Sequence, residues 1–329
     1  MPADETAALT DSHRIAQARI GARAAAGVMA DWQQMVHAGA PALSAGPWLD
    51  SSLGRIRSAR GASERLAVSY TRLHRAYATG STLPPAGSGP PARRTTIGQL
   101  RSDYAALAGE RPHARPQDAR VVPVEEFDWP EPDEQSMDDA ARTSLWVTGP
   151  VHAEQRLDAA EALHGRGRLD DAEFLAELDD MMRDCAATVG GAADREVLRG
   201  GRSLAEQSAR ADGRVVGWAR VTDSSPCGFC AMLASRGAVY KSRDSALFAG
   251  GPPVSLDDLT KYHDLCHCQI VPVYSRADHM PAGSVAWRDL WQEASDGRTG
   301  RDVRRAFDRA VAARRLAVRR RGLPTNRRS

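Results

Sequence analysis

Much of the N-terminal part of the chain has a pattern compatible with helices, although the apolar face is only rough. Residues 5–38 are rich in alanine and free of proline, residues 62–78 carry a rough apolar face, and a short helix is expected at 97–108. Residues 81–94 are rich in proline and glycine, and residues 109–136 contain several prolines and an acidic run. Because neither segment has a regular period, we expect linkers or extended loops there.

The stretch 137–211 is predicted to be helical again. A D-x-x-E sequence that begins at Asp170 is of the capping-box type found at helix starts, and an apolar face follows it. Cys185 lies on this face at helical spacing, so we expect a buried core thiol rather than a reactive one. Gly190 and Gly191 interrupt the pattern, which predicts a break there and a further helix up to residue 211.

The pattern changes after residue 213, where β-branched residues begin to alternate with others. Three strands are predicted, at 214–222, 238–242 and 268–275. Pro272 cannot donate a backbone hydrogen bond, so the last of these strands is expected at a sheet edge. A short helix is expected at 230–237 and a longer one at 284–295, where Trp287 and Trp291 share a face and are expected to pack in a core.

Composition narrows the class of protein. Apolar residues make up 42% of the chain, enough for a sizeable core, and charged residues make up 26%, so the chain is not compositionally disordered. No stretch approaches 18 consecutive apolar residues, so we expect no transmembrane helix and no membrane partner. The first ten residues have neither a basic nor an apolar region, which argues against a secretory signal. In a reducing cytosol the five cysteines are not expected to form a disulfide framework.

The formal net charge of +2 conceals an uneven distribution. Residues 298–329 contain 12 Arg against Asp302 and Asp308, so this tail carries +10 and the remaining chain carries −8. The tail is compatible with a helix up to Gly322, and Arg side chains bind phosphate well. It could contact DNA, dock on an acidic protein surface, or remain a solvated helix end. The candidate nucleic-acid or anion contacts are Arg304, Arg305, Arg309, Arg314, Arg315, Arg319, Arg320 and Arg321.

Four of the five cysteines lie within 42 residues of one another, in a pattern typical of zinc ligands. Cys227 and Cys230 form a C-x2-C pair, and Gly228 between them is expected to permit a tight turn that points both sulfurs at one ion. Cys266 and Cys268 lie two residues apart near a strand start, so they are expected to share a face, with His267 on the other.

With His263 three residues before Cys266, five candidate ligands compete for four places. The sets considered are the four cysteines Cys227, Cys230, Cys266 and Cys268, or the same set with His263 in place of one sulfur. Either set would make a structural zinc site, because no coordination position is left open. Reduced and buried thiols, or disulfides formed under oxidising conditions, are the alternatives.

An enzymatic interpretation also exists. The P-C-x-x-C half of the zinc deaminase motif fits Cys227 and Cys230, and His152 with Glu154 fits the H-x-E half, in which the Glu moves protons for an attacking hydroxide. Against it, about 70 residues with helical character separate the two halves. No hydrolase nucleophile elbow, phosphate-binding loop or metalloprotease motif is present. A bacterial zinc-binding DNA-interaction module is a third class.

The C-terminal region resembles the phage Mu F-type head-morphogenesis family, and within it the minor capsid proteins of actinobacterial phages. The matching residues are Trp218, Arg220 and Asp223, then Cys227 and Cys230, then His263, Cys266 and Cys268. Asp264 and His267 depart from the Pro and Arg that are usual in the family. The resemblance covers about residues 190–275. It implies a low-copy head protein that associates with the portal and with capsid or scaffold proteins, acts in DNA packaging or release, and passes from the host cytoplasm into the virion.

Together these patterns predict an α+β protein: a long, mainly helical N-terminal portion, a small β-containing C-terminal domain held together by the Cys/His cluster, and a basic helical tail. The expected division is into 1–135, a helical region with Pro-rich linkers; 136–212, a helical region; 213–297, the Mu F-like Cys/His domain; and 298–329, the Arg-rich tail. Some Mu F-like proteins carry the label of capsid maturation protease, but no catalytic constellation is visible here, so we expect no enzyme.

Overall fold

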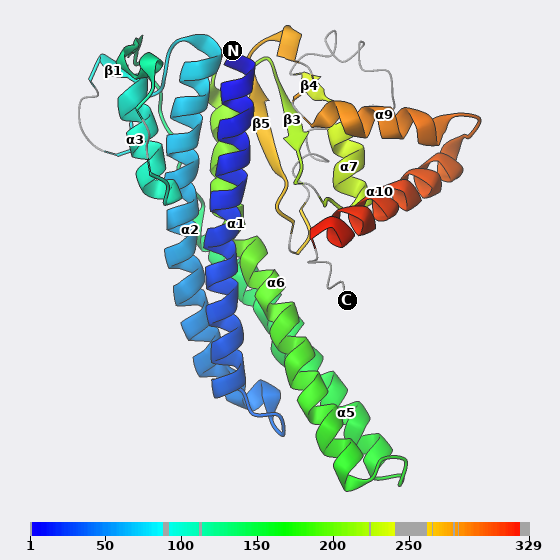
Figure 1. Cartoon of the computed structure of the whole chain (residues 1–329). Coiled ribbons are helices and arrows are strands. Elements are labelled where there is room, and N and C mark those ends of the chain that lie inside the picture. The colour runs from blue at the N-terminus through cyan, green and yellow to red at the C-terminus, as the bar shows by residue number, and fades with distance from the viewer. Residues whose placement is uncertain are drawn as a thin grey trace, which may run out of the picture.

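Three long helices form the body of the molecule (Figure 1). They are α1 (Pro2–Met35), α2 (Pro41–Thr79) and α6 (Asp171–Ala211), and each packs against the other two. The computed structural model describes residues 2–322 except 88–91, 112–113, 224, 241–261, 265, 279 and 282.

Shorter elements surround these helices. The helices are α3 (Ile97–Ala108), α4 (Glu134–Trp146), α5 (His152–His164), α7 (Gly228–Ser235), α9 (Ser284–Ser295) and α10 (Gly300–Gly322), with a π-helical turn at Val147–Val151 and 3-10 turns at Pro116–Ala119 and Arg276–Asp278. The strands are β1 (Arg94–Thr96), β2 (Val121–Pro123), β3 (Gly217–Val221), β4 (Ala238–Tyr240) and β5 (Gln269–Val273). β1 pairs with β2, and β3 lies between β4 and β5, all antiparallel. The predicted α+β class, with long helices before a small sheet, is confirmed.

The break predicted at Gly190 and Gly191 is wrong, because α6 runs through both glycines without interruption. The glycines of this helix lie where other helices approach closely. A Cβ added at Gly190 would lie 2.7 Å from Sδ of Met29 on α1, and one added at Gly201 would lie 2.5 Å from Oγ of Ser63 on α2. Close helix packing therefore offsets the low helix propensity of glycine.

Two predictions at the N-terminal end are also corrected. The helix expected at 62–78 begins 21 residues earlier, at Pro41, where a proline at the first helical position is well tolerated. Trp48 and Ile56 are fully buried, and their packing outweighs the glycines of this stretch. The segment 109–136, expected to lack regular structure, contains β2 and a 3-10 turn, and α4 begins before it ends.

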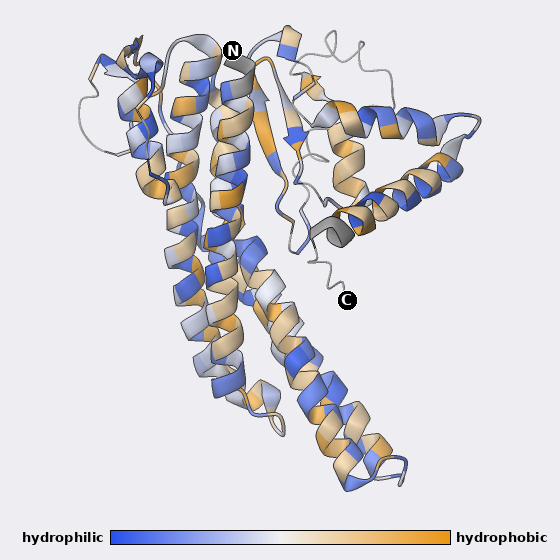
Figure 2. Ribbon diagram, in the orientation of Figure 1, coloured by the Kyte–Doolittle hydropathy of each residue, from blue (hydrophilic) through white to orange (hydrophobic). Residues whose placement is uncertain are grey.

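The main core lies between the long helices. Trp32 of α1 and Trp48 of α2 meet edge to face at 4.9 Å, and both are fully buried. Cys185 is also fully buried in this cluster, which confirms the prediction of a core thiol. Figure 2 shows apolar residues alternating with hydrophilic ones along these helices, as expected where one face is buried.

The C-terminal helices pack beside the small sheet (Figure 1). β5 is an edge strand of its sheet, which confirms the position predicted from Pro272. Trp287 is buried, and Trp291 contacts Phe307 of α10 edge to face, so the predicted tryptophan core is confirmed. The apolar stripe of α10 is buried only in its first half, because Leu316 near the end of the helix is 56% exposed.

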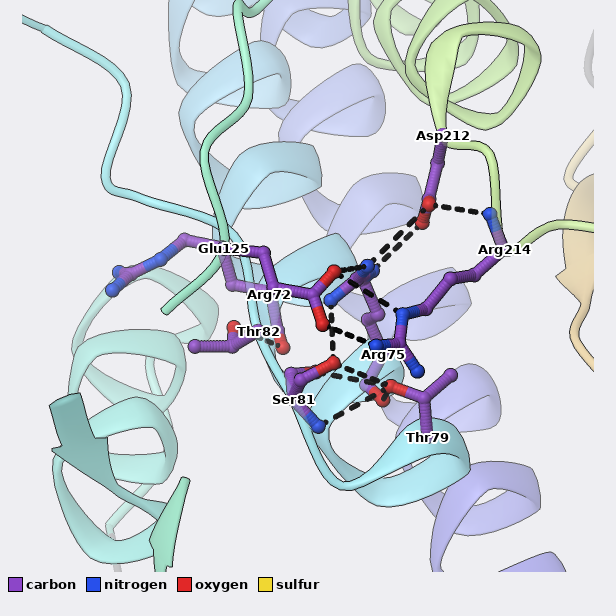
Figure 3. Close-up of polar contacts among 8 residues, drawn as sticks. All are labelled: Arg72, Arg75, Thr79, Ser81, Thr82, Glu125, Asp212 and Arg214. Atoms are coloured by element: carbon purple, nitrogen blue, oxygen red, sulfur yellow. Dashed lines mark hydrogen bonds and ion pairs between the residues drawn. The ribbon is translucent and has the colours of Figure 1, made fainter. Parts of the chain in front are cut away.

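A polar network around the buried guanidinium of Arg75 joins the ends of α2 and α6 (Figure 3). The guanidinium of Arg75 donates to Asp212 (2.8 Å), to Glu125 (2.6 Å) and to the hydroxyl of Ser81 (2.8 Å). Arg214 donates to Glu125 as well. Because Asp212 directly follows α6 and precedes β3, this network fixes the direction in which the chain enters the sheet.

Within the part of the chain that the structure describes, no helix is both long and apolar enough to cross a membrane, as the composition led us to expect. The four-part division of the chain stays a prediction, since no observation tests its boundaries. The last two residues of the predicted strand 238–242 and the tail residues 323–329 lie outside the described residues.

A buried histidine makes stability dependent on pH. His13 stacks on Tyr70 at 4.1 Å, and burial, with a contribution from His74, lowers its pKa to about 3. The unfolded chain takes up a proton near pH 6.5 and the folded chain does not, so the stabilisation is complete above pH 6.5 and is lost as pH falls toward 3. We expect His13→Phe to reduce the loss between pH 7 and pH 5 by about 2 kcal/mol.

The measurement is denaturant unfolding at the two pH values. Tyr70→Phe is the matched control, because it alters the same stack without removing a group that titrates in this range. An unchanged pH dependence in His13→Phe would contradict the expectation.

Candidate metal centre

The five predicted ligands converge at one end of the small sheet. Cys227 is the N-cap residue of α7, and its sulfur accepts a hydrogen bond from the backbone N–H of Cys230 (3.3 Å). Cys230 lies in the first turn of this helix, fully buried. The C-x2-C spacing therefore works as a helix cap that points both sulfurs to the same side.

The reason given for Gly228 is corrected by the structure. Its backbone is not left-handed, so glycine is not needed for the turn. Instead, the side chain of Asp308 on α10 lies so close that a Cβ at position 228 would collide with its carboxylate.

The second pair of cysteines lies just before β5. Cys266 and Cys268 point to the same side as Cys230, and the sulfurs of Cys230 and Cys266 are 3.6 Å apart. His267 points the other way, with Nε2 3.7 Å from a carboxylate oxygen of Asp194 on α6. The predicted alternation of faces is confirmed.

The ligand atoms form two groups that share Cys230. In one group are Cys227, Cys230 and His263; in the other are Cys230, Cys266 and Cys268; within each group all ligand atoms lie within 4.8 Å of one another. Nε2 of His263 is 3.1 Å from the sulfur of Cys227. Two donors on one tetrahedral zinc lie roughly 3.5–3.8 Å apart, so these sulfur and nitrogen atoms could hold a metal ion after small movements.

The sulfurs differ in their affinity for protons. Hydrogen bonding with Cys230, helped by His263, lowers the pKa of Cys227 to about 5, and hydrogen bonds with Cys230 and Cys268 also lower the pKa of Cys266. The hydrogen bonds that stabilise these thiolates raise the pKa of Cys230. Burial lowers the pKa of His263, but its hydrogen bond to the Asp264 carbonyl and the nearby sulfurs outweigh this and raise it. A lowered pKa favours the thiolate, the form of cysteine that binds metal.

Three residues that the sequence did not mark as ligand neighbours complete the surroundings. Arg220 of β3 is fully buried, and its Nη1 lies 3.6 Å from the sulfur of Cys230. Arg202 of α6 donates to the backbone carbonyls of Cys266 and Cys268. Both guanidiniums lie against the ring of Tyr262, at 4.5 and 3.9 Å. Of the three residues, only Arg220 could be singled out from the sequence, because it is one of the residues that carry the family resemblance.

The deaminase residues are not brought together. His152 and Glu154 lie at the start of α5, and Glu154 accepts a hydrogen bond from the backbone N–H of Ala42 on α2. Among the described residues, neither belongs to a group that could hold a metal with Cys227 and Cys230. Figure 1 shows α5 at the opposite end of the long helices from the small sheet.

The predicted anion contacts all lie on α10. Arg304 pairs with Asp308 at 3.1 Å, and Arg305 approaches Asp302 at 4.0 Å. Arg314 lies over the ring of Trp287, and Arg315 donates to the hydroxyl of Ser225. Arg309 is exposed. Arg319, Arg320 and Arg321 belong to the end of α10, and their side chains fall outside the described part of the structure.

Comparison with known proteins gives one match. A family model described as VG15 protein matches residues 138–294, which extend from α4 to α9 and include all five candidate ligands. No curated protein matches the chain, and no solved structure does. The chain is therefore similar to the VG15 protein family over the part that contains the small sheet and the Cys/His cluster.

Proposed function

We propose that the protein is a phage minor head protein that associates with the portal and acts in head morphogenesis and in DNA packaging or release. One observation carries the proposal. Trp218 and Arg220 on β3, the C-x2-C pair on α7 and the H-x2-C-x-C segment before β5 are the three parts of the Mu F-type resemblance, and they form one folded unit around Cys230. The VG15 protein match over the same region is consistent with this.

The cluster itself is proposed to bind one structural zinc ion. Cys230 is fully buried and Cys266 and Cys268 are each 3% exposed, whereas Cys227 is half-buried and His263 is exposed. Four protein ligands, which leave no coordination position open, are typical of zinc sites that hold a fold together rather than catalyse a reaction. Zinc bound here would join α7 to the start of β5.

The head-protein proposal is tested by quantitative mass spectrometry of phage heads purified from cells that express a tagged copy. We expect far fewer copies than of the major capsid protein, and no copies in heads assembled without the portal. Glu154→Ala is expected to enter heads normally, since His152 and Glu154 are not part of the cluster. Absence from purified heads, or equal amounts with and without the portal, would overturn the proposal.

We further propose that the exposed arginines of α10 contact phage DNA inside the head. Arg301, Arg305, Arg309 and Arg314 are exposed, and the acidic residues of this helix are only Asp302 and Asp308. Binding through phosphates should be independent of sequence and should weaken steeply as salt increases.

In the corresponding test, duplex DNA binding is measured between 50 and 200 mM salt, a range in which phosphate contacts lose most of their affinity. Replacing Arg305 and Arg309 with Gln is expected to reduce the slope of log affinity against log salt by about 2. Arg166 and Arg168, both exposed at the α5–α6 turn, provide a control pair in which the same replacement leaves the slope unchanged. Equal effects of both pairs would contradict a role for α10.

A further inference from the structure

The charge of the cluster sets a condition on its surroundings. A zinc ion with four thiolates carries −2, and with three thiolates and a neutral histidine it carries −1. A net charge in a buried site is costly unless an opposite charge lies close by. The number and place of nearby cations therefore indicate which ligand set the site is built for.

One cation lies directly against the sulfurs. Arg220 comes from β3, whose other residues are Gly217, Trp218, Ala219 and Val221, so it is the charged side chain of an otherwise apolar strand. It is fully buried, and its Nη1 is 3.6 Å from the sulfur of Cys230. Arg202, by contrast, is half-buried and directs its guanidinium to the carbonyls of Cys266 and Cys268 rather than to sulfur.

The orientation of His263 is the second observation. Its Nδ1 donates to the backbone carbonyl of Asp264 at 2.7 Å, which leaves Nε2 facing the sulfur of Cys227 at 3.1 Å. A histidine that binds a metal commonly has its other ring nitrogen bonded to a carbonyl in this way, because the hydrogen bond fixes both the tautomer and the direction of the ring. His263 thus has the arrangement of a ligand.

The third observation separates the last two cysteines. The sulfurs of Cys266 and Cys230 are 3.6 Å apart, close to the separation of about 3.8 Å expected for two sulfurs on one tetrahedral zinc. Cys268 belongs to the same group, with its sulfur within 4.8 Å of those of Cys230 and Cys266. With His263 in the fourth place, Cys268 is the sulfur left over.

We propose that Cys227, Cys230, His263 and Cys266 hold the metal, that the buried guanidinium of Arg220 balances the single negative charge of this Cys3His centre, and that Cys268 is not a ligand. The inference rests on the proposed zinc site and goes beyond it by selecting the ligand set and by giving Arg220 the role of counter-cation. Arg220 is a positioning residue here, since it acts on the metal through the thiolates.

The ligand set is tested by titrating the purified full-length protein with zinc and with Co²⁺, whose absorption reports the number of bound sulfurs. Cys268→Ala is expected to keep one metal per chain and an unchanged Co²⁺ spectrum. His263→Ala and Cys266→Ala are expected to lose the tetrahedral spectrum. The opposite result, with metal kept by His263→Ala and lost by Cys268→Ala, would establish a four-cysteine centre and overturn the inference.

The role of Arg220 is tested with Arg220→Gln, which removes the charge, and Arg220→Lys, which keeps it. We expect Arg220→Gln to bind zinc about 10- to 100-fold more weakly, the usual effect of losing a residue that supports the ligands. Arg220→Lys is expected to keep most of the affinity, because it keeps the charge. The sulfur-to-cobalt absorption should move to longer wavelength in Arg220→Gln, because a thiolate without a nearby cation gives up its electrons more easily. A role in folding alone would not move this band.

Arg236→Gln is the matched control, because Arg236 is a partly buried arginine of the same region that lies over Trp291 rather than beside a sulfur.

If the unaltered protein binds no metal, the proposed zinc site fails together with the inference. If it binds metal and Arg220→Gln binds equally tightly, only the inference fails. If Arg220→Gln does not fold, Arg220→Lys decides: a band and an affinity like those of the unaltered protein support the role of the charge, and loss of both overturns it.

Discussion

Replacing Cys230 with Ser is expected to abolish metal binding and to disrupt the region from β3 to α9, with a loss of more than about 3 kcal/mol in the free energy of unfolding. Cys230 is the residue that both ligand groups share, and it is fully buried in the first turn of α7. Its loss removes the residue that joins the C-x2-C pair to the segment before β5.

The measurements are the metal content of the purified protein and its thermal unfolding with and without a chelator. A chelator is expected to lower the unfolding temperature of the unaltered protein and to leave that of Cys230→Ser unchanged. Cys185→Ala is the control, because it removes a fully buried thiol from a different cluster. It should retain one metal per chain and lose about 1 kcal/mol or somewhat more from the cavity. Equal metal content in both variants would contradict the expectation.

Replacing Arg75 with Met is expected to cost about 3–5 kcal/mol, the usual effect of removing one partner from a buried ion pair. The Arg75 side chain is 2% exposed and that of Asp212 is 5% exposed, so the substitution removes a cation from beside a carboxylate that lies away from water. Because these residues connect α2 to the chain that enters β3, we expect the substitution to destabilise both the long helices and the small sheet.

Unfolding in denaturant measures this effect, and Arg183→Met provides the control. Arg183 pairs with Asp180 on the surface of α6, where both side chains are more than half exposed, so its loss should stay within about 0.5 kcal/mol. The double variant Arg75→Met with Asp212→Asn should recover part of the stability, since it also removes the negative charge that Arg75 balances. A cost for Arg75→Met no larger than that for Arg183→Met would show that the network carries no net stabilisation.

The features that the sequence predicted well depend on short-range spacing. The two cysteine pairs and His263 were recognised because ligands two or three residues apart in a turn or a strand must point to one side. Cys185, Pro272 and the pair Trp287 and Trp291 were placed correctly for the same reason: a helix or strand period alone determines the face on which each lies.

The features that were missed depend on contacts between distant segments. Gly190 and Gly191 resemble helix breakers until Met29 and Ser63 are known to pack against the glycines of α6. Arg202 and Tyr262 are 60 residues apart, and nothing local in α6 marks Arg202 as a neighbour of the metal ligands. Periodicity cannot reveal a partner that arrives from another element.

The contact between Gly228 and Asp308 links the candidate metal centre to the basic helix. Gly228 lies between two candidate ligands, whereas Asp308 belongs to the arginine-rich helix. Because the Asp308 carboxylate occupies the place of a Cβ at position 228, a larger residue there requires Asp308 to turn away, a smaller residue at 308 or a displaced α10. A substitution between the two cysteines would therefore disturb the ion pair of Asp308 with Arg304, so the charge arrangement of α10 depends on a residue of the candidate metal centre.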